Sequence, residues 1–166
     1  MMKLLLLSLA LVLAAFSQMP AAIAAGDGGV AVRLEASKVV AQAGGESLQP
    51  ATAARPGDTV EYRATYTNRG KSVARNVEAT LPIPAGTLVY LPATARPTAV
   101  LASLDGNRFA PVPLTRTVIR ADGTKELQPV PYAEYRYLRW TLGDLAPGAS
   151  TTIRARMGVN NGEKQP

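Results

Sequence analysis

Two segments of this chain combine a Pro-Gly turn with strict alternation of apolar and polar residues. Pro56-Gly57 precedes an alternating run over residues 60–67, and Pro147-Gly148 precedes another over residues 152–159. A period of two places every second side chain on the same face of an extended strand. The chain is therefore predicted to form antiparallel strands that each bury one face.

The same alternation recurs elsewhere. Further strands are expected over residues 30–36, 77–81, 87–91, 99–104 and 138–142, and no segment after residue 24 has a helical period of 3.6. Seven to nine short strands joined by Gly, Pro, Asn and Asp are typical of an all-β antiparallel sandwich. An open sandwich is favoured over a closed barrel because polar residues on the first and last strands would protect open edges. Those two strands are expected to pair at or near one edge.

Turn residues predict how the strands connect. Asn68-Arg69-Gly70-Lys71 favours a tight reversal, so residues 60–67 and 77–81 are expected to form a hairpin. Asp105-Gly106 and Asp122-Gly123 each predict another hairpin. The Gly143–Gly148 turn is expected to join the last two strands as neighbours, with Trp140 in the core because its parity partners are both Leu.

The N-terminus resembles an export signal. Lys3 precedes an apolar run from Leu4 to Phe16, and small residues end at Ala24. Residues 1–24 are therefore predicted to be a secretory signal peptide, with an uncleaved anchor as the alternative. The remaining 142 of the 166 residues suit one domain, a sandwich over 25–159 followed by a polar tail over 160–166. The product is expected to be a monomer in the periplasm or outside the cell, with no stable membrane span.

Composition argues against catalysis. The chain has no His and no Cys, which removes most zinc sites, Cys or His nucleophiles and Ser-His-Asp triads. Four aspartates fall in predicted turns, where Asp accepts hydrogen bonds from its own backbone, and no Asp-rich calcium loop is present: Asp58, Asp105, Asp122 and Asp144. We expect no enzyme activity, metal or cofactor. The net charge is +6, but the arginines are scattered, so nucleic-acid binding is not predicted.

One group of side chains is predicted to form an interaction surface. Its members are Tyr135, Tyr137 and Arg139 opposite Trp140, extended by Arg154 and Arg156 on the neighbouring strand. Exposed Tyr and Arg side chains stack on sugars and anchor protein partners. The alternative is that they simply suit a solvent-facing sheet.

Lys38 falls on the buried parity of the first strand. An inward Lys bonds covalently to an Asn of a last strand in some surface immunoglobulin-like domains, and Asn160 and Asn161 lie near that end of the chain. No acidic residue is obviously placed to catalyse such a bond here. A lysine that extends its ammonium group to solvent at a strand end is the favoured interpretation.

These motifs together resemble the bacterial conserved-repeat domain of unknown function (domain of unknown function eleven), an immunoglobulin-like family of cell-surface and envelope proteins. The shared pattern runs through Pro56-Gly57, Tyr62, Asn68-Arg69-Gly70, Asn76-Val77, Leu81-Pro82, Trp140, Leu142, Leu145 and Pro147-Gly148, within residues 55–159. Thr80 replaces a common acidic residue, and Ile83-Pro84 lengthens the following corner. The resemblance implies an immunoglobulin-like fold in a free-standing exported protein, with no active site.

We therefore expect an exported, non-enzymatic immunoglobulin-like module with a structural or protein-interaction role in the bacterial cell envelope. The alternative is a module that binds envelope glycan through the Tyr and Arg surface. The two are distinguished by replacing both tyrosines with Ala and measuring glycan retention, because only the glycan-binding module is expected to lose it.

Overall fold

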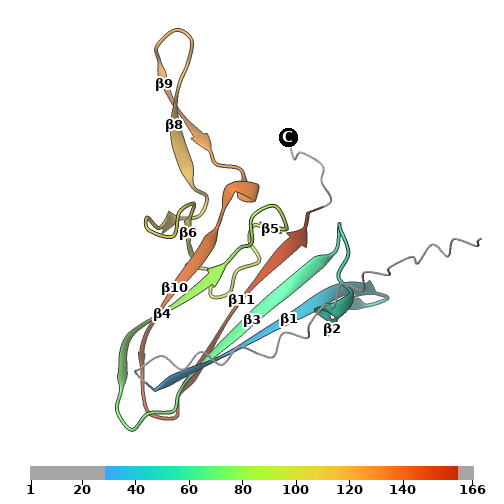
Figure 1. The fold of residues 1–166 in the computed structure, drawn as a ribbon, viewed down its shortest axis with the longest axis vertical. Coiled ribbons are helices and arrows are strands. Elements are labelled where there is room, and N and C mark those ends of the chain that lie inside the picture. Colours follow the sequence, from blue (N-terminus) through green and yellow to red (C-terminus); the bar gives the residue numbers. More distant parts are fainter. Residues whose placement is uncertain (1–28, 161–166) are drawn as a thin grey trace, which may run out of the picture.

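The computed structural model of the protein describes residues 29–160 as an all-β sandwich of antiparallel sheets (Figure 1). This confirms the predicted fold class. The predicted signal peptide over 1–24 and all but the first residue of the polar tail lie outside the described residues. Within residues 29–160, no helix is long and apolar enough to span a membrane.

The larger sheet has five strands in the order β2-β1-β3-β11-β5. Its central strand β3 pairs with β1 on one side and with β11 on the other, along most of its length. The bounds are β1 (Val30–Gln42), β2 (Gly45–Pro50), β3 (Thr59–Asn68), β5 (Leu88–Tyr90) and β11 (Ser150–Val159).

The second sheet has four strands in the order β4-β10-β6-β7, and β8 and β9 form a separate two-stranded hairpin. The bounds are β4 (Ala74–Pro82), β6 (Leu101–Ser103), β7 (Ala110–Pro111), β8 (Thr115–Ile119), β9 (Lys125–Pro129) and β10 (Tyr137–Leu145), with single 3-10 turns η1 (Ala51–Ala53) and η2 (Tyr132–Glu134). The described chain thus has eleven strands instead of seven to nine, because several short pairings add strands of two or three residues.

The core lies between the two larger sheets. Trp140 is 1% exposed, as predicted, and its indole N–H donates to the Pro97 carbonyl at 2.9 Å. Inward side chains of β3 and β11, among them Ala64 and Ile153, belong to the same apolar cluster as Leu81 of β4. Alternation along each strand is therefore what gives each sheet its buried face.

Two predicted hairpins are wrong. β3 and β4 lie in different sheets, and so do β10 and β11, so each connection crosses from one sheet to the other. Asn68 joins the two crossings: its backbone N–H donates to the Ala149 carbonyl at 2.9 Å, and its side chain donates to the Leu145 carbonyl at 2.8 Å. Local turn residues reverse the chain in either arrangement, so they do not decide which sheet receives the next strand.

The first and last strands also pair differently from the expectation. β3 separates β1 from β11, so the predicted pairing of first and last strands is wrong. The two Asp-Gly hairpins are confirmed, because Asp105-Gly106 lies between β6 and β7 and Asp122-Gly123 lies between β8 and β9. The β8–β9 hairpin rises away from the sandwich (Figure 1).

Candidate functional site

Tyr135 is not a surface residue. It is 0% exposed, its ring lies 5.1 Å from the ring of Tyr132 and 6.3 Å from that of Tyr90, and its hydroxyl accepts the Leu114 N–H at 2.6 Å. Burial raises the pKa of this phenol. The prediction that Tyr135 is exposed is wrong because strand alternation applies only within β10, which begins at Tyr137. Tyr135 follows the turn η2 and points inward.

Tyr137 and Arg139 point outward from β10, but neighbouring residues of the same chain contact both. The Arg139 guanidinium lies 3.6 Å above the Phe109 ring and 3.4 Å from a Glu78 carboxylate oxygen. The Tyr137 ring packs against Gly106, where an added Cβ would lie 3.0 Å from the ring. These contacts are those of a paired, solvent-facing sheet.

Arg154 and Arg156 lie on β11, in the other sheet, because the connection after β10 crosses the sandwich. Outward residues of β10 and β11 therefore face opposite sides of the molecule. The five predicted residues therefore do not form one surface: Tyr137 and Arg139 share the outer face of β10, Arg154 and Arg156 share that of β11, and Tyr135 is buried.

Those two arginines surround Glu61, a carboxylate that is 3% exposed although it has outward parity on β3. Its oxygens lie 3.1 Å from Arg63 Nη2, 3.2 Å from Arg156 Nε and 4.0 Å from Arg154 Nη1. Burial opposes ionisation of Glu61, but the hydrogen bonds from Arg63 and Arg156 and the nearby charges outweigh it and lower its pKa. Arg156 also forms a two-point contact with Glu46 at 3.0 and 2.7 Å.

Three arginines lie in direct register across this face. Arg63 of β3 is the partner of Arg154 of β11, and Arg154 exchanges two backbone hydrogen bonds of 2.8 Å with Arg96. Side chains at such positions share one face of the sheet and are close neighbours. The Arg96 guanidinium donates hydrogen bonds to the backbone carbonyls of Ala93 and Ala95, which are neutral acceptors.

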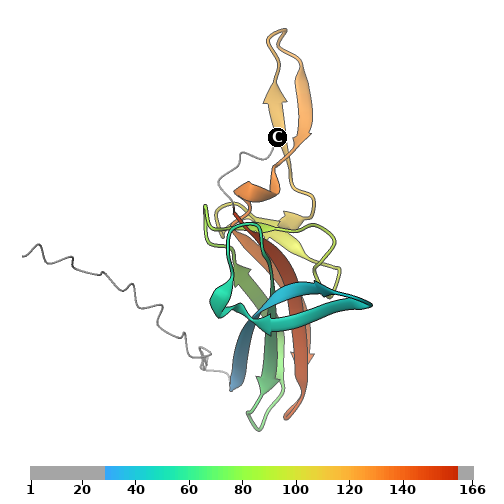
Figure 2. The same ribbon diagram turned by 90° about the vertical axis from the view of Figure 1, so that its right-hand side faces the viewer.

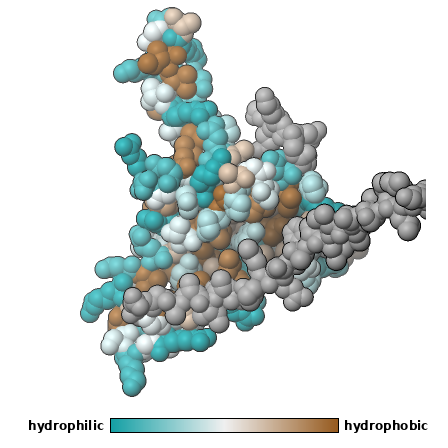
Figure 3. Space-filling view, viewed as in Figure 1, coloured by the Kyte–Doolittle hydropathy of each residue, from teal (hydrophilic) through white to brown (hydrophobic). Residues whose placement is uncertain are grey.

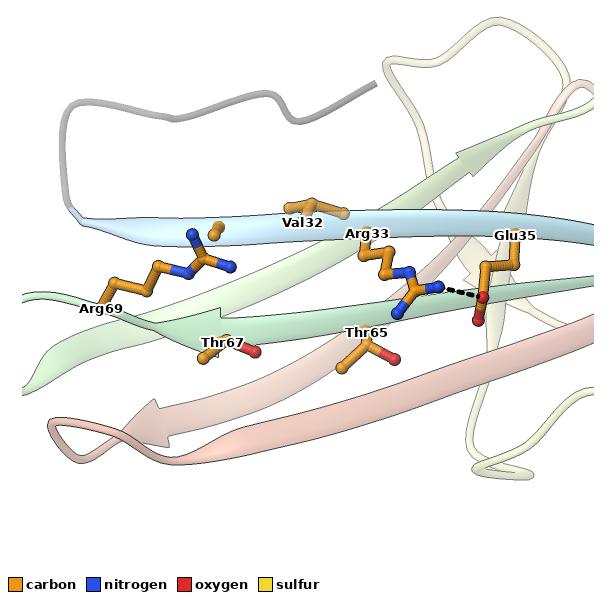
Figure 4. Close-up of a pocket in the computed structure, with 7 residues that line it drawn as sticks. Val32, Arg33, Glu35, Thr65, Thr67 and Arg69 are labelled. Carbon is orange, nitrogen blue, oxygen red and sulfur yellow. Dashed lines mark ion pairs between the residues drawn. The ribbon is translucent and has the colours of Figure 1, made fainter. Parts of the chain in front are cut away.

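Two hollows of about 360 Å³ lie on the outer face of the five-stranded sheet. One is lined by Arg63, Arg96, Pro97, Thr152 and Arg154. In the other, Arg33 and Arg69 approach from opposite ends, with Thr65 and Thr67 of β3 between them and Arg33 paired to Glu35 at 2.8 Å (Figure 4). The hydroxyls of Thr65 and Thr152 lie 3.0 Å apart and connect the two hollows.

The β8–β9 hairpin presents a different kind of surface. Ile119 and Leu127 are 68% and 70% exposed. They share one face of the hairpin, because Ile119 lies opposite Lys125 and Leu127 lies opposite Thr117. Figure 2 shows the hairpin standing clear of both sheets, and Figure 3 shows an apolar cluster near its end, flanked by polar residues.

The base of the hairpin is fixed to the core. Val130 N–H donates to the Leu114 carbonyl at 2.9 Å, and both residues are buried. Arg116 of β8 forms an ion pair of 2.9 Å with Glu134 beside it. The arm therefore begins at an ordered position even though its strands lie outside the sandwich.

The predicted turn aspartates are confirmed at three positions and differ at the fourth. Asp58, Asp105 and Asp122 each accept nearby backbone N–H groups, whereas Asp144 lies in β10 and accepts the Asn76 N–H across the sheet at 2.9 Å. No cluster of metal-ligating side chains occurs in residues 29–160.

Lys38 forms an ion pair of 2.7 Å with Asp58 and is three-quarters buried. The Asn160 amide donates to the Gly86 carbonyl at 3.0 Å, and Asn161 lies outside the described residues. The favoured interpretation of Lys38 therefore needs a correction: its ammonium group meets a carboxylate and does not simply extend to solvent.

Neither a protein-family model, nor a curated protein, nor a solved structure matches the chain.

Proposed function

We propose that this protein is an exported, non-enzymatic immunoglobulin-like module that binds a protein partner in the bacterial cell envelope. The observation that carries the proposal is the projecting β8–β9 hairpin with exposed Ile119 and Leu127. Exposure of large apolar side chains to water is unfavourable, and their burial against a partner would lower the free energy of the complex. The sandwich acts as the support, and the hairpin is the contact element.

Export and family membership are parts of the same proposal. They are supported by the charged, apolar and small-residue segments of residues 1–24 and by the motif pattern within residues 55–159. Sequencing the N-terminus of the protein isolated from cell envelopes tests export directly. A product that begins after Ala24 is expected, and an intact Met1 would contradict cleavage.

The partner contact is tested by photo-crosslinking in the native envelope. A photoreactive residue at position 119 or 127 should give the same discrete protein adduct, whereas one at position 48 should not. Leu48 is a matched control because it is a large apolar residue that is 47% exposed on a different element. Equal adducts from all three positions, or none from the hairpin, would reject the hairpin as the binding element.

Glycan binding through the Tyr and Arg surface has less support. Tyr135 lies in the core, and Arg139 is held by Phe109 and Glu78. Neither side chain is free to stack on a sugar ring. Loss of envelope-glycan retention in Tyr137→Ala, with unchanged thermal stability, would favour this second function over protein binding.

A further inference from the structure

We propose that the hollow lined by Arg63, Arg96, Thr152 and Arg154 binds a tetrahedral oxyanion, a phosphate or sulfate group. This site lies on the outer face of the five-stranded sheet and is independent of the hairpin contact. Three features of the hollow suit such a ligand: the register of the arginines, the shortage of carboxylates beside them, and the hydroxyl of Thr152.

The register places like charges next to each other. Arg63, Arg154 and Arg96 occupy directly opposed positions on three adjacent segments. Like charges at such positions repel and destabilise a sheet. Arg63 and Arg154 are each nearly half exposed, so their guanidinium groups meet solvent in the hollow. An anion placed among them would remove the repulsion and form charge-assisted hydrogen bonds.

Carboxylates do not balance these charges. Four arginines and two glutamates form this cluster: Arg63, Arg96, Arg154 and Arg156 with Glu46 and Glu61. Glu46 is engaged by Arg156, and Glu61 is shared by Arg63 and Arg156 at short distance while Arg154 lies at 4.0 Å. Glu35 lies opposite Arg63 on β1, but it is paired with Arg33 at 2.8 Å. The excess of two positive charges is centred on Arg96 and Arg154.

Five other arginines of the described chain are arranged differently. Each has a carboxylate of its own within 4 Å, in the pairs Arg33–Glu35, Arg75–Asp144, Arg116–Glu134, Arg120–Glu126 and Arg139–Glu78. A face that only needed solubility would carry the same alternating pairs. The unbalanced row at Arg63, Arg154 and Arg96 therefore points to a ligand that supplies the missing negative charge.

Thr152 adds a hydroxyl to the hollow. Its oxygen lies 3.0 Å from the Thr65 hydroxyl, and either one can be the donor. When Thr65 donates, the Thr152 hydroxyl is free to donate to a bound oxyanion. Guanidinium forks and a hydroxyl are the donors that phosphate and sulfate groups accept from.

The binding test is a titration with inorganic phosphate at constant ionic strength, followed by the Nε–H resonances of the arginine side chains. Saturable chemical-shift changes of the Nε–H resonances are expected at Arg63, Arg96 and Arg154. The ion-paired Arg116 should show smaller changes. Arg154→Gln should weaken phosphate binding at least tenfold, whereas Arg116→Gln should leave it unchanged. Equal, non-saturating shifts at all four arginines, or unchanged affinity in Arg154→Gln, would overturn the proposal.

Thermal melting separates a binding role from a structural one. Without added anion, Arg154→Gln should melt close to the wild-type protein, because it removes both the repulsion from Arg63 and Arg96 and the attraction of Glu61 at 4.0 Å. Phosphate should raise the melting temperature of the wild-type protein above its value in chloride of equal ionic strength, and Arg154→Gln should lose this increment. A variant that melts lower and keeps the increment would show that Arg154 serves the fold alone.

The source of the oxyanion is identified by two further arms. Polyphosphate chains and vesicles that contain phosphatidic acid are tested against the wild-type protein and Arg154→Gln. Tighter binding of polyphosphate indicates a soluble polymer as the natural ligand, and tighter binding of the vesicles indicates a lipid headgroup. If inorganic phosphate, polyphosphate and vesicles all bind Arg154→Gln as well as the wild-type protein, the site does not recognise oxyanions.

Discussion

Asn68 shows how one side chain can organise a whole end of the sandwich. It is fully buried, and its amide donates to the carbonyls of Ser72 and Leu145 at 2.8 Å while its side-chain oxygen accepts the Gly70 N–H at 2.9 Å. These bonds tie the crossing after β3 to the crossing after β10. The sequence around Asn68 is that of an ordinary turn, but in the fold this residue links the two sheets by hydrogen bonds.

Replacing Asn68 with Ala should lower the free energy of unfolding by about 3 kcal/mol, since two carbonyls and one N–H lose their partners at about 1 kcal/mol each. Urea denaturation of the purified protein measures this change. Asn107→Ala is the matched control, because Asn107 is exposed in a turn and should change stability little. Equal stability of the two variants would show that solvent reaches the groups around Asn68.

The β8–β9 hairpin is an element that the sandwich does not need for its core. Its two strands pair only with each other, and Leu114 and Val130 close its base by a backbone hydrogen bond. A two-stranded hairpin is marginally stable by itself. It therefore depends on the sandwich more than the sandwich depends on it.

Excising residues 115–129 and joining Leu114 to Val130 through Asn-Gly should leave the sandwich folded, with a loss of about 1 kcal/mol or less because exposed pairs such as Arg116–Glu134 contribute little. Circular dichroism and urea denaturation check this. Leu114→Ala in the intact chain is the contrasting variant, because the cavity it leaves should cost about 3 kcal/mol. Collapse of the excised protein would make the hairpin part of the fold.

Features that depend on local sequence could be predicted, whereas features that depend on pairing between distant segments could not. Alternation predicted the strands around Val60 and Ile153 and the burial of Trp140, because parity is a local property. The partners of β4 and β11 could not be predicted, since a turn does not specify the receiving sheet. Tyr135 was misplaced because its parity was extended beyond the start of its strand.

The candidate oxyanion site was only partly foreseeable. Arg154 and Arg156 were singled out by their outward parity, but the sequence paired them with the wrong strand. Arg96 and Glu61 were missed: Arg96 lies outside any regular strand, and Glu61 is buried only because arginines from two strands cover it. Pairing across the sheet brings these residues together, so a single strand pattern carries no signal for them.

For the molecule as a whole, charge decides how stability depends on pH. The chain has no His, so no side chain with an ordinary pKa between about 5 and 8 is present. Several carboxylates have lowered pKa values in the folded state, mainly through hydrogen bonds to Lys38 at Asp58, to the backbone at Asp105 and to Arg63 and Arg156 at Glu61. A lowered folded pKa means that the unfolded chain binds more protons in acid.

Stability should therefore be level from about pH 5.5 to pH 8 and fall below about pH 4.5, where unfolded Asp and Glu with pKa values of about 3.9 and 4.3 begin to bind protons. Glu61 is the member of the group to test, because it is buried and accepts hydrogen bonds from two arginines. Glu61→Gln should be less stable than the wild-type protein by about 2 kcal/mol at pH 7, the scale of a hydrogen bond to a charged group, and the difference should shrink as pH falls through the folded pKa. Urea denaturation at a series of pH values measures the stability of both proteins.

Glu35→Gln is the control, because Glu35 is a carboxylate on the same face with an exposed partner. Its free energy of unfolding should differ from that of the wild-type protein by less than about 0.5 kcal/mol at every pH. A Glu61→Gln difference that stays constant down to pH 3 would mean that packing at this position, and not the ionised carboxylate, stabilises the arginine cluster.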